Sequence, residues 1–174
     1  KPIKMKRTMM MLLLTLLSMG VYAQHDHDNM AGHGEEMQMS PKFKDKDLGA
    51  AYEHYLLVKD ALVASNDAKA AKHSMKLEKT LAKVENAETA RKEASQMAGA
   101  TSLEDQRDNF NALSDAMLKL VKNGKLAKGE IYLEYCPMAN SNKGGYWLSN
   151  EKAIKNPYMG QKMLKCGSVK ETIN

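Results

Sequence analysis

The prediction of the fold starts from one stretch, Ser102 to Gly124, which reads SLEDQRDNFNALSDAMLKLVKNG. Its apolar residues follow one another at alternating steps of four and three, which places them on one face of an α-helix. These residues are Phe110, Leu113, Met117 and Leu120. Ser102 is a favoured N-cap residue, and Asn123-Gly124 predicts a left-handed position at the helix end. The stretch therefore predicts one complete amphipathic helix.

Two further helices are predicted on its N-terminal side. The first has an apolar face formed by Leu48, Tyr52, Tyr55, Leu56, Leu62 and Val63. The second, capped by Asn66 or Asp67, has a face formed by Leu77, Leu81, Val84, Ala87, Ala94 and Met97. Ala98–Thr101 separates it from the third helix. Short connections between three helices predict a three-helix antiparallel bundle.

The pattern changes at Gly129. Apolar and polar residues alternate from Ile131 to Tyr135, which predicts a short strand running into Cys136. Turn-forming residues at 142–145 precede a second short strand, so we expect a β-hairpin. A proline at the first position predicts a short helix over 157–165. The predicted fold class is thus mainly α, with a compact C-terminal segment made of a hairpin and a short helix.

The N-terminal residues are typical of an export signal. Three basic residues precede an apolar run from Met9 to Leu17, and Val21-Tyr22-Ala23 supplies small residues suited to cleavage. The run is too short to remain as a membrane-spanning helix. We therefore expect a signal peptide over 1–23 and a periplasmic or secreted protein without stable membrane insertion after cleavage.

The net charge of +5 is weak evidence for nucleic-acid binding, because the predicted signal contributes most of it. Four basic residues and no acidic residue lie in the predicted signal, so 22 basic residues face 21 acidic ones in the remainder. Nucleic-acid binding needs a strongly basic face, and we expect none. The remaining 151 residues suffice for one domain with a core.

A polar segment over 24–46 shows neither helical nor strand periodicity, and we expect it to be disordered. The domain itself is predicted to span 47–174. Imidazoles suit divalent copper, zinc or nickel, whereas thioethers suit monovalent copper. The segment is therefore a candidate for secondary metal capture through His25, His27, Met30, His33, Met37 and Met39. The alternative is a plain low-complexity linker.

Both cysteines and three methionines lie in the last forty residues. The candidate metal ligands are Cys136, Met138, Met159, Met163 and Cys166. Thiolates and thioethers are soft donors that select monovalent copper or silver. In the predicted C-terminal helix, steps of four and three residues place Met159, Met163 and Cys166 on one face.

Other interpretations of these residues stay open. Two cysteines in an exported protein usually form a disulfide, which would leave poor metal ligands. A Cys136–Cys166 bond would close a loop of about 31 residues and stabilise the fold by about 3–4 kcal/mol in the chain-entropy model. Methionine at helical spacing commonly fills a core. His54 and His73 have no histidine or cysteine four residues on and are expected at the surface or half-buried, while Trp147 is expected in the core.

No catalytic arrangement is visible in the sequence. It contains no Cys-x-x-Cys pair, no His-x-x-x-His zinc motif and no recognisable Ser-His-Asp order. We therefore expect a protein that is not an enzyme.

Several motifs resemble a bacterial family of secreted domains of formally unknown function, also found attached to periplasmic adaptor subunits of copper/silver efflux pumps. The C-terminal motifs are Tyr135–Ala139, Trp147–Ser149, Asn156–Gly160 and Met163–Gly167. The helical ones are Tyr55–Val63 and Gln106–Phe110 with Leu113-Ser114. The resemblance implies a mainly helical domain with a compact cysteine–methionine segment and a link to heavy-metal handling. It carries the same five sulfur residues over as candidates.

These observations predict a periplasmic copper- or silver-binding protein that buffers the metal or delivers it to efflux, as in heavy-metal resistance. The expected partners are the metal ion and a heavy-metal efflux adaptor. The alternative is a disulfide-stapled helical interaction module that binds no metal.

Overall fold

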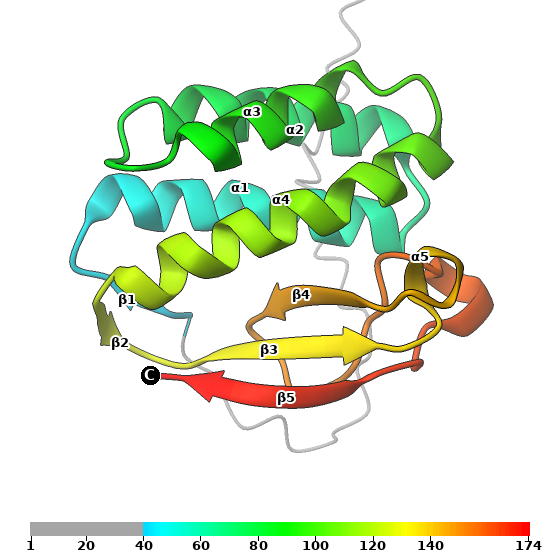
Figure 1. Cartoon of the computed structure of the whole chain (residues 1–174). Coiled ribbons are helices and arrows are strands. Elements are labelled where there is room, and N and C mark those ends of the chain that lie inside the picture. The colour runs from blue at the N-terminus through cyan, green and yellow to red at the C-terminus, as the bar shows by residue number, and fades with distance from the viewer. Residues whose placement is uncertain (1–39) are drawn as a thin grey trace, which may run out of the picture. The chain divides into compact units, whose positions relative to one another are not determined.

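A computed structural model describes residues 40–174. The first part of this range contains β1 (Lys42–Phe43), α1 (Lys46–Val63), α2 (Asp67–Leu81), α3 (Glu88–Gly99) and α4 (Leu103–Asn123). The second part contains β2 (Leu126–Lys128), β3 (Ile131–Cys136), α5 (Ala139–Asn142), β4 (Gly145–Ser149), the 3₁₀ helix η1 (Gly160–Met163) and β5 (Ser168–Ile173). The domain is mainly helical with a small sheet beside the helices (Figure 1).

Four long helices form the first part, where three were predicted. Each packs on the next, and α4 also contacts α1, which closes the group. The prediction of one helix from Asp67 through Met97 was wrong because the chain turns between Leu81 and Glu88. Asn86 occupies this turn with φ of 56°, a left-handed conformation that asparagine tolerates better than most residues.

The prediction for α4 was confirmed in its bounds and its N-cap. The Ser102 hydroxyl accepts a hydrogen bond of 3.0 Å from the Asp105 N–H. The left-handed position predicted at the helix end is wrong, because Gly124 has φ of −75°. Glycine is needed there for space instead, since an added Cβ would clash with Leu48 Cδ2.

The ordered domain begins earlier than predicted. Lys42–Phe43 pairs with β2 in a two-stranded antiparallel sheet, and Asp45 caps α1. The Phe43 ring is buried and packs edge-on against Tyr52, with ring centroids 5.5 Å apart. Residues 40–46 thus belong to the domain, although the sequence placed them in the disordered segment. The predicted signal peptide and the His/Met residues of 24–39 lie outside the described residues.

The second sheet has the strand order β4-β3-β5, and both pairings are antiparallel. The predicted hairpin was confirmed, with Tyr135 opposite Tyr146. Strand β5 was not predicted, because its residues are mostly exposed and show no apolar alternation. It pairs with β3 from Ile131 opposite Ile173 to Tyr135 opposite Ser168.

The predicted helix over 157–165 is instead a turn followed by the short 3₁₀ helix η1. Asn156 caps the turn as expected, because its Oδ1 accepts from the N–H groups of Tyr158 and Met159. An α-helix does not continue, since Gly160 has φ of 54°. A Cβ there would lie 2.6 Å from Arg107 Nη2. The α-helical face expected to carry Met159, Met163 and Cys166 is therefore not formed.

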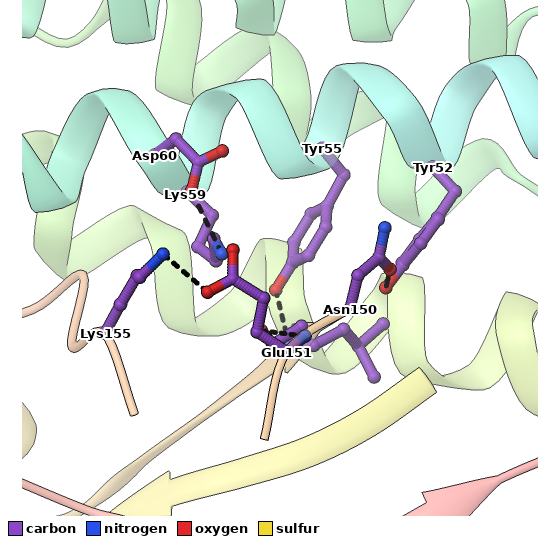
Figure 2. Close-up of polar contacts among 9 residues, drawn as sticks. Tyr52, Tyr55, Lys59, Asp60, Asn150, Glu151 and Lys155 are labelled. Atoms are coloured by element: carbon purple, nitrogen blue, oxygen red, sulfur yellow. Dashed lines mark hydrogen bonds and ion pairs between the residues drawn. The ribbon is translucent and has the colours of Figure 1, made fainter. Parts of the chain in front are cut away.

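Tyr55 joins the helices to the sheet (Figure 2). Its fully buried hydroxyl makes a hydrogen bond of 2.8 Å with Ser114 Oγ on α4. The same oxygen accepts a hydrogen bond of 3.0 Å from the Leu148 N–H on β4. The ring stacks on Phe110, with centroids 5.5 Å apart. One side chain of α1 therefore fixes both α4 and the outer edge of β4.

The described helices include none that is long and apolar enough to cross a membrane.

Tyr55→Phe should reduce the free energy of unfolding by about 2–3 kcal/mol, because the buried Leu148 N–H loses its acceptor. Urea unfolding followed by circular dichroism measures the change. Tyr146→Phe is the matched control, since that ring is 38% exposed, and it should change stability by less than about 0.5 kcal/mol. Equal effects of the two substitutions would contradict the role given to Tyr55.

Glu134 is a second buried polar group, on β3. Its side chain is 0% exposed, and burial raises its pKa from 4.5 to about 8, although the charge of Lys59 opposes the shift. The folded state therefore binds this proton more tightly than the unfolded state does. The resulting stabilisation is complete below pH 4.5 and disappears as the pH rises through 8.

Glu134→Gln should remove this pH dependence, because glutamine keeps the shape and cannot ionise. Between pH 5 and pH 8.5 the stability of the unmodified protein should fall relative to the variant by about 2–4 kcal/mol. Urea unfolding of both proteins across this range gives the difference, in which the titration of other groups cancels. Parallel stability curves would rule out a raised pKa for Glu134.

Candidate functional site

The two cysteines meet at one end of the sheet. Cys136 is the last residue of β3, and Cys166 lies two residues before β5. The pairing of Tyr135 with Ser168 brings their backbones together, and the two Sγ atoms are 2.6 Å apart. The 29 residues between the two cysteines therefore begin and end at the same point of the sheet.

Both cysteines are free thiols in this structure. Their separation lies between two bonded arrangements. A disulfide requires about 2.05 Å, whereas two thiolates on one tetrahedral ion with metal–sulfur distances of about 2.3 Å lie roughly 3.8 Å apart. An oxidant that takes up two electrons and two protons would form the disulfide after a small approach, and a separation by about an ångström more would admit an ion.

The protonation of Cys166 favours the thiol over the thiolate. Its pKa is raised, first by the hydrogen bond with Cys136 and then by burial. The Met138 N–H points to the same sulfur and opposes the shift by stabilising negative charge there. A metal ion at this pair would therefore have to displace a proton, which makes binding pH-dependent.

Asn156 positions the Cys166 segment. Its buried Nδ2 donates a hydrogen bond of 2.8 Å to the Cys166 carbonyl, while its own N–H donates to the Leu164 carbonyl over 2.9 Å. Since Oδ1 also caps the turn at Tyr158 and Met159, one side chain joins both ends of the 156–166 loop. The sequence indicated only the cap, because Asn-Pro identifies a turn and not a contact ten residues away.

The three candidate methionines differ in whether they line a groove. Met138 is 45% exposed, and Met159 is half-buried. Both line a groove of about 390 Å³ beside Tyr158 and Arg107. Met163 lies in η1, is half-buried, and is not among the residues lining this groove. The structure thus brings the cysteines together and places two methionines on a groove that neither cysteine lines.

Arg107 fixes one wall of the groove. Its Nε donates to the Pro157 carbonyl, and its Nη2 donates to the Leu62 carbonyl and to Ser65 Oγ, each over 3.0 Å. These bonds tie the turn before η1 to the end of α1. Among residues 40–174, no three histidine, cysteine or acidic side chains are grouped closely enough to hold a metal ion, so a third sulfur ligand beside the two cysteines would have to be a methionine.

Comparison with known proteins finds a family match in the helical part of the chain. Residues 51–129 match the family described as "Protein of unknown function (DUF3347)". The match runs from within α1 to just after β2 and supports a domain of unknown function. The cysteine–methionine motifs lie outside it. No curated protein and no solved structure matches the chain.

Asn156→Ala should lower the free energy of unfolding by about 2–4 kcal/mol, because it leaves buried N–H and carbonyl groups without partners. It should also raise the rate at which Cys166 reacts with a thiol reagent, since the loop loses its main constraint. Thermal unfolding and thiol-reaction kinetics measure the two effects. Asn109→Ala, on α4, is the control and should leave both unchanged. A stable Asn156→Ala variant would refute the positioning role.

Proposed function

We propose that this protein is a periplasmic soft-metal-binding domain that takes up monovalent copper or silver and buffers it or delivers it to an efflux system. The proposal rests on one observation: the sulfurs of Cys136 and Cys166 lie together, 2.6 Å apart, although they come from distant segments. Two thiolates form a soft donor set, for which these monovalent ions have the highest preference.

Met138 is the candidate for a third sulfur ligand. The Met138 backbone N–H contacts the Cys166 sulfur, and the exposed Met138 side chain lines the groove shared with Met159. Binding would release the thiol protons and widen the pair to the spacing of a dithiolate. Cys166 lies in a half-buried loop between η1 and β5 and packs against the core, so this widening would shift the loop. Met163, in the neighbouring 3₁₀ helix, is the remaining candidate.

A second function is favoured by the same distance. Because the two sulfurs adjoin, removal of two electrons and two protons by an oxidant would join them and convert the segment into a covalently closed loop. The domain would then be an interaction module that binds no metal. The disulfide would stabilise it by about 3–4 kcal/mol in the chain-entropy model.

Titration of the reduced protein with monovalent copper, in competition with a chromogenic chelator, tests the first function. We expect one tightly bound equivalent. Cys136→Ser should abolish this binding, and Met138→Leu should weaken it about tenfold, a loss of about 1.4 kcal/mol. Met75→Leu is the matched control, because Met75 is similarly exposed on α2. Binding that survives Cys136→Ser would exclude the site.

Counting free thiols in protein isolated from the periplasm separates the two functions. Two titratable thiols support metal binding. A fully blocked pair that is released only by a reductant, in protein that carries no copper or silver, supports the interaction module.

A further inference from the structure

We propose that His54 on α1 and His73 on α2 form a second metal site, selective for a divalent ion of intermediate softness such as Zn²⁺, Cu²⁺ or Ni²⁺. The two histidines lie on the helical part of the domain and share no residue with the cysteine pair. The inference is independent of the proposed function, since it concerns different ligands and a different class of ion.

The geometry of the two rings fits an ion between them. Their centroids are 6.2 Å apart and their planes are inclined by 32°. An ion bound at about 2.0–2.1 Å from one nitrogen of each ring would hold the centroids roughly 5–6 Å apart. Only a small movement of half-buried side chains is therefore needed. The sequence did not reveal this pair, because the two residues are nineteen positions apart and belong to different helices.

Both rings contain a nitrogen without a partner. The Nδ1 atoms of His54 and His73 are buried and make no hydrogen bond. Buried polar atoms in folded proteins are nearly always paired, so these two nitrogens, on neighbouring rings, are available to a shared ligand. Divalent transition-metal ions are the ligands that neutral imidazole nitrogens bind best.

The charge state of the rings suits metal binding. Burial lowers the pKa of both histidines, and the positive charge of Lys76 lowers each further. Both imidazoles are thus neutral near pH 7 and keep a free lone pair, which metal ligation requires.

Positive charge around the two rings limits their affinity for a cation. Lys76 faces both rings, and Lys69 and Lys72 also act on His73, whereas the negative charge of Glu53 acts on His54. With two protein ligands and a net positive surrounding, water must complete the coordination. The expected site is therefore weak enough to exchange its ion readily, with a dissociation constant on the order of micromolar.

The test uses the full chain carrying His25→Gln, His27→Gln and His33→Gln, so that the predicted tail ligands are silent. Titration with Zn²⁺ by calorimetry is compared between this parent and the same chain with His54→Gln or His73→Gln added. Each added substitution should weaken binding at least tenfold or remove one equivalent. Because only differences from the parent are used, Zn²⁺ bound at the cysteines cancels.

Lys76→Gln in the same parent is the matched variant. It should strengthen binding several-fold, because it removes a positive charge beside both rings and no ligand. In parallel, the imidazole NMR signals of His54 and His73 in the parent should shift together with one equivalent of Zn²⁺. Unchanged titrations in both histidine variants, or imidazole signals that do not respond, would overturn the proposal.

Discussion

The hydroxyl of Tyr55 is the point on which the arrangement of helices and sheet depends. Strand β4 forms an edge of the sheet, so the outward N–H of Leu148 has no strand to pair with. Tyr55 supplies its acceptor from α1 and simultaneously bonds Ser114 on α4. Since a buried N–H without a partner costs more than an ordinary hydrogen bond contributes, the sheet has one favoured position against the helices. Because Cys136 ends β3, the position of the sheet also sets the position of the cysteine pair.

Local sequence patterns predicted the elements whose physical causes are local. Helix α4 has a cap and a regular apolar face, and the β3–β4 hairpin has alternation on both strands and a turn between them. The break between α2 and α3 contains neither glycine nor proline, and an asparagine in a left-handed conformation suffices. Strand β5 forms because β3 has a free edge, which is a property of the assembled sheet and not of the residues 168–173.

In the candidate site too, local patterns predicted some features, whereas contacts between distant segments determined others. Residue type alone pointed to the candidate soft ligands, and their clustering in the sequence suggested that they meet. The α-helical spacing assumed for Met159, Met163 and Cys166 failed because Gly160 interrupts the helix beside Arg107. The contacts of Asn156 and the closeness of His54 to His73 were not predictable, since each depends on a contact between segments that no periodicity connects.

The strand order bears on the order in which the parts of the domain fold. Helices α1–α4 make contacts mainly between neighbours in the chain, and such local topologies form quickly. The cysteines adjoin only after β5 has joined β3 across the intervening loop. This topology therefore favours late formation of the sulfur pair during folding.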